Sequence, residues 1–349
     1  MRAARRRGLG RVVLAMGLIV VFALAGLGYV LYEQTAVKPD TVSLALGFTP
    51  NGGDAPIYYG LESGIYRQNG INLSIIPEAS HVAGISALVA GDVDFAVVSP
   101  AAVVDYVAHN NSTDIVIVAS KFAKSDLAVV FNNASISQVS DLNGKAGAML
   151  SPALGDVSGD FHLFATTNGL NVSSMDLQYG SVTTSDDLLL SGKVQFIVVA
   201  IQNLPVVQAT GAAEGLKLGA FVMADYGVAS AGDSLATTRS MIQQHPDIVR
   251  AFVQATMQSM VSAYSNQEQA VSDLVRDNPQ LNQTSNLQAY QILLRYCSID
   301  PQGLTSPLQY GWMDPQYMQQ TVDNEIVANN LGAAINATTL YTNQFVEPP

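Results

Sequence analysis

The sequence contains a single cysteine, Cys297, so no disulfide can form within the chain. Positive charge is also scarce, because 16 Lys and Arg stand against 28 Asp and Glu in 349 residues. The first 31 residues hold five arginines and no acidic residue, so the rest has 11 Lys and Arg and a formal charge of −17. A surface this acidic repels nucleic acid, which we therefore exclude as a partner.

Recognisable catalytic motifs are absent as well. No Gly-x-Ser-x-Gly and no phosphate-binding Gly-x-x-x-x-Gly-Lys occurs, and no dinucleotide-binding glycine motif follows the first predicted strand. The only histidines are His81, His109, His162 and His245, which share no metal-ligand spacing. The adjacent acids Asp186 and Asp187 point apart on a predicted helix. We therefore predict no catalytic residues, no metal site and no cofactor, and favour a binding protein over an enzyme.

The chain begins with arginines followed by Val12–Leu31, a run of twenty uncharged residues. About 20 apolar residues suffice to span a bilayer, and flanking arginines mark the cytoplasmic side. Residues 1–31 are thus predicted to be a transmembrane anchor or, alternatively, a cleaved signal peptide with a small-residue site near Ala23–Ala25. Residues 32–40 would be a tether, and the rest would lie at the extracytoplasmic face of the membrane.

Acceptor sequences for asparagine-linked glycans are frequent. Seven Asn-x-Ser/Thr triplets begin at Asn72, Asn110, Asn111, Asn133, Asn171, Asn282 and Asn336. Such triplets fit a glycosylated outer face, although a chain rich in Asn, Ser and Thr also produces them by composition alone.

Strand-like and helix-like segments alternate between residues 41 and 100. Strands are predicted at 41–48, 71–77 and 94–99, and helices at 57–70, at 81–92 and from Pro100 onward. This alternation predicts an α/β fold with parallel crossovers. Ligands of such sheets lie beyond the carboxyl ends of the strands, which places Phe48–Asp54 and Ser99 beside a ligand. Asp54 could cap the following helix, contact the ligand, or do both.

The later chain predicts a second α/β unit and a return to the first. Strands are predicted at 114–122, 127–133, 177–179, 194–200 and 234–240, and helices at 185–190, 270–277, 288–297, 315–331 and from His245 onward. We therefore expect lobe 1 at 41–126 and 225–349, with lobe 2 inserted at 127–224. Two lobes joined by two crossings can close over a ligand by rotation.

The predicted strand ends carry few cations, with Lys121 and Lys124 the nearest. A multiply charged anion usually recruits paired arginines. A neutral or singly charged polar ligand held by Asn, Ser, Asp and backbone N–H groups is the better fit.

Several segments resemble solute-binding proteins for the pyrimidine precursor of thiamine, and more distantly the sulfonate, taurine and nitrate binders. The similar stretches are Pro50-Asn51, Ala55 to Tyr58, Glu62–Tyr66, Leu88–Pro100, Asp141–Lys145, Leu190–Val194 and Gly311–Pro315. The resemblance spans about residues 41–331. It departs from the family at Phe48, often Trp in the family, at Gly53-Asp54, which replaces a His, and at Gln202–Pro205, which replaces an aromatic-rich stretch.

The resemblance implies a two-lobed type II periplasmic-binding-protein fold and the solute-binding subunit of an ABC importer, with a permease and its ATPase as partners. The small-molecule ligand would be a thiamine pyrimidine precursor, or alternatively a sulfonate, taurine or nitrate. A pyrimidine-synthase-like enzyme or a membrane-tethered ligand sensor would also be compatible with such a fold. Phe48 and Tyr226 would stack on a ring. The remaining ligand-binding candidates are Asn51, Asp54, Ser99, Ser151, Asp156, Gln202, Asn203 and Asp225.

Overall fold

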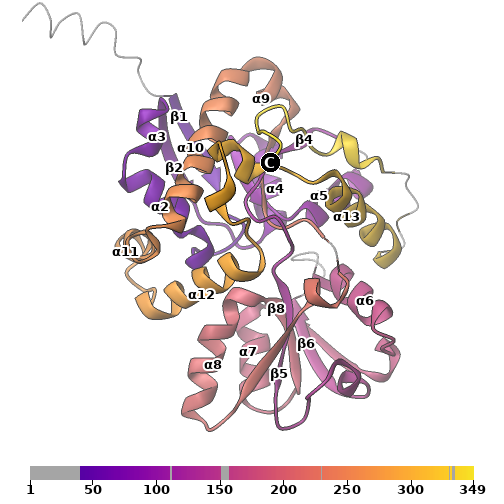
Figure 1. Cartoon of the computed structure of the whole chain (residues 1–349). Helices are drawn as coiled ribbons and strands as arrows, with labels where there is room; N and C mark the ends of the chain where they lie inside the picture. The colour runs from indigo at the N-terminus through magenta and orange to yellow at the C-terminus, as the bar shows by residue number, and fades with distance from the viewer. Residues whose placement is uncertain (1–39, 111, 151–156, 229, 330, 332–334) are drawn as a thin grey trace, which may run out of the picture. The chain divides into compact units, whose positions relative to one another are not determined.

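The computed structural model describes residues 40–110, 112–150, 157–228, 230–329, 331 and 335–349 (Figure 1). The predicted span at 12–31 lies outside this part of the chain, as do Ser151 and Asp156. Within the described ranges, no helix combines the length and the apolar character that a membrane crossing requires.

The described strands form two five-stranded sheets. The first has the order β2-β1-β3-β10-β4, with β1 at Asp40–Ala45, β2 at Ile71–Ile76, β3 at Phe95–Val98, β4 at Ile115–Ser120 and β10 at Ser234–Thr238. The second has the order β7-β6-β8-β5-β9, with β5 at Leu127–Asn132, β6 at Ala146–Leu150, β7 at Asp176–Gly180, β8 at Phe196–Ala200 and β9 at Leu218–Val222. Lobe 1 and lobe 2 below denote these sheets with the helices packed on them.

Each sheet is mixed, and the parallel crossovers predicted for residues 41–100 are confirmed in β1, β2 and β3. β1 runs parallel to β2 and β3, and β6 runs parallel to β7 and β8. β10 is antiparallel to β3 and β4, and β5 is antiparallel to β8 and β9. The antiparallel pairings of β5 and β10 have one cause. Each of these strands receives the chain directly from the other lobe, so no crossover helix brings the chain back to run parallel to its neighbours.

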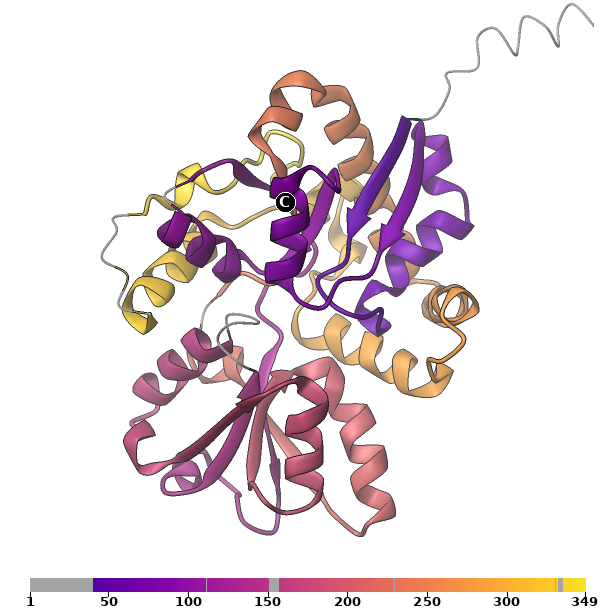
Figure 2. The same cartoon turned by 180° about the vertical axis from the view of Figure 1, so that it is seen from behind.

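Helices cover both faces of each sheet (Figures 1 and 2). In lobe 1 they are α2 (Ala55–Glu62), α3 (Ile65–Gln68), α4 (His81–Ala90), α5 (Pro100–Asn110), α9 (Arg239–Gln244), α10 (Pro246–Tyr264), α11 (Gln267–Asp277), α12 (Gln283–Tyr296) and α13 (Pro315–Ala328). In lobe 2 they are α6 (Val157–Thr167), α7 (Val182–Leu190) and α8 (Leu204–Ala213). Apolar side chains from α2 and α10 fill one side of the first sheet, and those from α4, α5 and α13 fill the other.

The helix predicted from His245 onward is α10, which buries an apolar stripe including Val249, Val253 and Met257. Its Phe252 stacks on Phe95 of β3 with ring centroids 3.9 Å apart. The single helix predicted at 57–70 is wrong, because Gly64 adopts a φ of +78° and divides it into α2 and α3. The strand predicted at 234–240 ends at Thr238, whose hydroxyl accepts from the Met241 N–H and starts α9.

Candidate ligand-binding site

A cavity of about 520 Å³ lies where the carboxyl ends of strands from both sheets meet the two crossings between the lobes. This is a usual size for a small-molecule site. Its polar lining comes from lobe 1 at Thr49, Asn51, Asp54, His81 and Ser99, from the crossings at Lys121, Ser125, Asp126, Ser230 and Asp233, and from lobe 2 at Asp160, Ser181, Thr183, Gln202 and Asn203.

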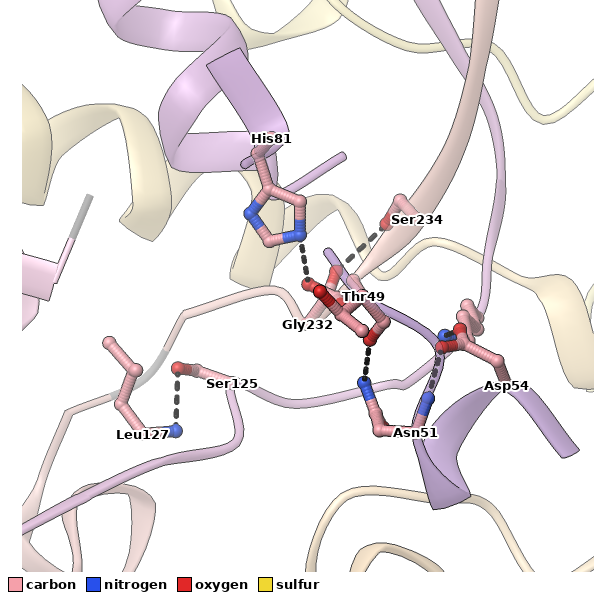
Figure 3. Close-up of polar contacts among 10 residues, drawn as sticks. Thr49, Asn51, Asp54, His81, Ser125, Leu127, Gly232 and Ser234 are labelled. Carbon is pink, nitrogen blue, oxygen red and sulfur yellow. Dashed lines mark hydrogen bonds and ion pairs between the residues drawn. The ribbon is translucent and has the colours of Figure 1, made fainter. Parts of the chain in front are cut away.

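The turn after β1 is a compact hydrogen-bonded unit (Figure 3). The Asn51 side chain accepts from the Gly53 N–H at 2.9 Å, and the Asp54 carboxylate accepts from the Asn51 N–H at 3.2 Å. Gly52 is required here, since a Cβ would lie 2.3 Å from the Asn286 carbonyl oxygen. The prediction that Asp54 caps α2 is corrected: its side chain makes no capping bond to that helix, because it is engaged by Asn51 and Lys121.

Lys121 and Asp54 form a buried ion pair at the cavity wall. The Lys121 Nζ donates to Asp54 Oδ1 at 2.7 Å, and the two residues are 3% and 4% exposed. Burial alone would lower the pKa of Lys121, but Asp54 and Asp233 outweigh burial and raise that pKa. Lys121 therefore stays charged, and its charge is already neutralised by Asp54.

His81, at the first position of α4, brings a second ionisable side chain to the same wall. Its Nε2 lies 3.4 Å from Asp233 Oδ1, and its ring packs edge-to-face on Phe48 at 4.8 Å between centroids. Burial acts to raise the pKa of Asp233, but His81 and Lys121 overcome it and lower that pKa. His81, Asp233, Lys121 and Asp54 thus form a row of alternating charge when His81 is protonated.

Gly47 makes the position of His81 possible. A Cβ on Gly47 would lie 2.2 Å from the imidazole Cδ2, well inside van der Waals contact. The sequence pattern did not identify His81 as a site residue, although one signal was available. Like Asn51, it follows the carboxyl end of a strand of the first sheet, with Ser80 as the helix cap.

A buried carboxylate joins the two crossings. Asp160 of α6 accepts from the Ser125 hydroxyl at 3.0 Å and from the Ser230 hydroxyl at 2.7 Å. The Asn324 side-chain amide of α13 donates to the Ser230 hydroxyl at 3.1 Å. Ser125 and Ser230 lie on different crossings, so one carboxylate of lobe 2 is bonded to both connections.

Lobe 2 contributes mainly neutral polar groups away from this carboxylate. Ser181 and Thr183 lie at the start of α7 and are exposed. Gln202 and Asn203 lie in the short 3-10 helix η5 (Ile201–Asn203) after β8. The Gln202 Oε1 is buried at the cavity and accepts no hydrogen bond from a described residue. It is therefore an acceptor available to a ligand.

Of the ten predicted ligand-binding residues, six line the cavity: Phe48, Asn51, Asp54, Ser99, Gln202 and Asn203. Ser151 and Asp156 lie outside the described residues.

Asp225 and Tyr226 do not line the cavity, which corrects the expectation that Tyr226 faces a ligand. They belong to the 3-10 helix η6 (Met223–Tyr226) after β9, where Asp225 is exposed. The Tyr226 ring packs edge-on against Phe164 and Phe221 instead. The hydrophobic contacts of lobe 2 thus hold the ring that was predicted to stack on a ligand.

Metal ligands do not gather in the described part of the chain, where no cluster of three or more His, Cys, Asp or Glu side chains is suited to a metal ion. Cys297 is buried, and burial raises the pKa of its thiol well above the usual value. It therefore remains a neutral thiol, as is usual for a packed cysteine.

Comparison with known proteins shows the same architecture. The chain is 23% identical over 311 residues to the riboflavin-binding protein RibY of Chloroflexus aurantiacus, covering 87% of this chain and 86% of that one. The alkanesulfonate-binding protein SsuA of Xanthomonas axonopodis pv. citri, bound to MOPS, superposes with a TM-score of 0.67 at 12% identity over 88% of this chain and 100% of that one. The nitrate-binding protein NrtA of Synechocystis PCC 6803 gives 0.65 at 12% identity over 89% and 88%.

Two mixed sheets, two crossings and a cavity at the strand ends define the two-lobed periplasmic-binding-protein fold of type II, the fold predicted from sequence. The chain belongs to the family described as NMT1/THI5 like, whose model matches residues 51–270, well over half of the chain. The superfamily recognised from the sequence motifs is thereby confirmed.

Proposed function

We propose that the protein is the extracytoplasmic solute-binding component of an ABC importer, which captures a small molecule between its lobes and delivers it to a permease and its ATPase. The family match and the solute-binding names of the proteins with this fold support the proposal. The predicted N-terminal anchor or signal would place the binding lobes outside the membrane. Ligand would shift the population from open to closed lobes.

The charge of the cavity lining favours a particular class of ligand. Lys121 is the one described lining residue with a permanent positive charge, and Asp54 neutralises it. Asp126, Asp160 and Asp233 add further negative charge. A sulfonate or nitrate would enter a region of net negative charge, whereas an uncharged or weakly basic ligand would not be repelled. This excess of carboxylates is the observation on which the ligand class rests.

We infer a flat nitrogen heterocycle, with an aminopyrimidine of the thiamine-precursor type as the first candidate. The half-buried Phe48 at the cavity wall offers a ring surface worth about 1 kcal/mol in an aromatic pair. The unpartnered Gln202 Oε1 suits an exocyclic amino group, which is a hydrogen-bond donor. Asn51, Ser99 and Asn203 supply further donors and acceptors along the ring edge.

A flavin is the second candidate. The cavity volume of about 520 Å³ exceeds the needs of one pyrimidine ring and lies within the range that encloses drug-sized ligands. RibY of Chloroflexus aurantiacus, whose similarity extends over most of its own chain and of this one, is named a riboflavin-binding protein. The same features, a ring surface and neutral hydrogen-bonding groups, serve a three-ring heterocycle.

A pyrimidine-synthase activity is less well supported. Such an enzyme would need His and Cys side chains at the pocket, but Cys297 is buried and does not line the cavity. His81 is the one described histidine in the lining, and it contacts Asp233 and Phe48.

Calorimetric titration of the purified full-length chain tests the proposal. The ligands are a 4-aminopyrimidine with a hydroxymethyl group, riboflavin, taurine and nitrate. We expect one heterocycle to bind with a micromolar or lower Kd and both anions to give no heat. Binding of taurine or nitrate with neither heterocycle bound would overturn the ligand class, and conversion of a bound ligand to product would overturn the transport role.

A further inference from the structure

The acceptor triplets for asparagine-linked glycans share a common placement in the fold. Six of the seven triplet asparagines lie within the described residues, and all six are exposed: Asn72, Asn110, Asn133, Asn171, Asn282 and Asn336. None of them lines the cavity. A glycan on these side chains would therefore project from the outer surface and leave the ligand site open.

Asn336 and Thr338, the first and third residues of one triplet, are hydrogen-bonded to each other. Its Oδ1 accepts from the Thr338 N–H at 3.0 Å and from the Thr338 hydroxyl at 2.8 Å. The hydroxyl that defines the triplet is therefore bonded to the amide that would carry the sugar. Donation into an amide oxygen draws the nitrogen lone pair toward the carbonyl and makes the N–H more acidic. The Nδ2 itself bonds to no described residue.

Asn282 combines an exposed amide with a structural role that modification would preserve. Its Oδ1 accepts from the Ser285 N–H at 2.9 Å and caps α12. Attachment at Nδ2 converts the side chain to a secondary amide, which keeps the capping oxygen. The helix cap and a glycan are thus compatible.

Asn110 provides a contrast within the same protein. Its Nδ2 donates to the Tyr106 carbonyl at 2.9 Å, so the nitrogen that would be substituted is already bonded to the helix. One of the two N–H bonds at this nitrogen is thus engaged, whereas no described residue accepts a hydrogen bond from the Nδ2 of Asn282 or Asn336.

We propose that Asn282 and Asn336 are glycosylated in the exported protein. In the reaction, Nδ2 attacks the anomeric carbon of a lipid-diphosphate-linked sugar. The new C–N bond replaces the C–O bond to phosphate, the amide proton passes to a base, and the lipid diphosphate leaves. The co-reactant is thus an activated oligosaccharide at the outer face of the membrane, supplied by a transferase. The inference rests on the extracytoplasmic location in the proposed function.

Peptide mass mapping of the full chain, purified from the cells that produce it naturally, tests this directly. Trypsin releases Asp277–Arg295, which contains only the Asn282 triplet. Cleavage after glutamate releases Ile326–Pro349, which contains only the Asn336 triplet, because Pro348 protects the bond after Glu347. We expect both peptides to carry a sugar mass on the triplet asparagine. Asn286 and Asn343 lie in the same two peptides outside any triplet and serve as internal controls that should stay unmodified.

Threonine variants complete the test. Thr338→Val should abolish the sugar on the Ile326–Pro349 peptide, and Thr338→Ser should retain it. The proposal is overturned if either peptide occurs only unmodified, or if Thr338→Val leaves the modification in place. Failure of ligand binding in the titration would contradict the proposed function without altering these peptide masses, so the two outcomes are distinguishable.

Discussion

The two sides of the cavity differ in how their polar groups are satisfied. On the lobe 1 side and the adjoining crossings, Asp54, Lys121, His81 and Asp233 are charged or titratable and already contact one another. On the lobe 2 side, the groups at the ends of β7 and β8 are hydroxyls and amides, and the Gln202 Oε1 has no partner among the described residues. The charged groups of the lobe 1 wall are therefore paired with one another without a ligand, whereas the lobe 2 wall holds an acceptor that can still form a hydrogen bond.

This difference indicates that the two lobes contribute to ligand binding in different ways. Charges held in place by each other cost no reorganisation when a ligand binds, so the lobe 1 wall sets shape and electrostatics. The lobe 2 groups are neutral, and the buried Gln202 Oε1 still lacks a donor among the described residues, so under the proposed function lobe 2 would supply further hydrogen bonds to the ligand. Variants on the first wall should change folding and binding together, and variants on the second should change binding alone.

The largest effect is expected from Lys121→Met. Removing the cation leaves the buried Asp54 carboxylate without its partner, which typically costs about 3–5 kcal/mol. Denaturant unfolding measures the loss. Adding Asp54→Asn should recover much of it, because the uncompensated charge is then gone. The exposed neighbour Lys124→Met should stay within about 0.5 kcal/mol of the wild type, and an equal loss there would refute the assignment to the ion pair.

Gly47→Ala should follow in size. The added methyl collides with the His81 ring and must displace it from Asp233 and Phe48, at a cost of about 1–3 kcal/mol in stability. Ligand affinity should fall roughly tenfold, equivalent to about 1.4 kcal/mol. Gly303→Ala is the matched control, since its Cβ would meet nothing within 4 Å. Unchanged affinity in the Gly47 variant would show that the imidazole position does not matter to the ligand.

A pH effect distinguishes the carboxylates of the two lobes. Burial, followed by the charge of Asp187, raises the pKa of Asp186 on α7 to about 7. In the unfolded chain this carboxyl titrates near pH 4, so between about pH 4 and 7 the folded state binds more protons than the unfolded state. Stability should therefore fall as pH rises through this window. The depressed pKa of Asp233, on a crossing between the lobes, acts with the opposite sign.

Asp186→Asn should remove the loss assigned to Asp186. Because the carboxyl is only partly shielded from solvent, the gain at pH 8 should be on the order of 1–2 kcal/mol. Thermal unfolding across pH 4–8 measures it, with the exposed Asp176→Asn on β7 as control. If the variant is no more stable than the wild type at pH 8, the raised pKa of Asp186 is contradicted.

The smallest effect is expected from Gln202→Ala. Losing one neutral acceptor should weaken ligand binding about fivefold, near 1 kcal/mol, and leave unfolding unchanged. Calorimetry with the identified ligand measures the change, and Gln288→Ala on the exposed side of α12 is the control. A loss of stability that equals the loss of affinity would erase the contrast between the two walls.

The sequence pattern predicted the elements and the strand-end residues better than the contacts between distant segments. Asn51, Ser99 and Gln202 were correctly expected near the cavity because each lies in the segment that follows the end of a strand, and local pattern is enough to place such residues. His81 also follows a strand end, behind the helix cap Ser80, and was overlooked. Its contact with Asp233 depends on β10 returning between β3 and β4, which no local pattern encodes. Tyr226 was misplaced because periodicity does not tell which side of a short 3-10 helix faces the core.

The carboxylate shared by the crossings has a mechanical consequence. With Ser125 and Ser230 both bonded to Asp160, the two connecting segments are tied at one point instead of bending independently. Two connecting segments joined at one point resist twisting and sliding against each other but still permit flexing about that point. We therefore expect motion between the halves of this protein to be restricted to flexing about this shared point, so that each capture of a solute follows the same path.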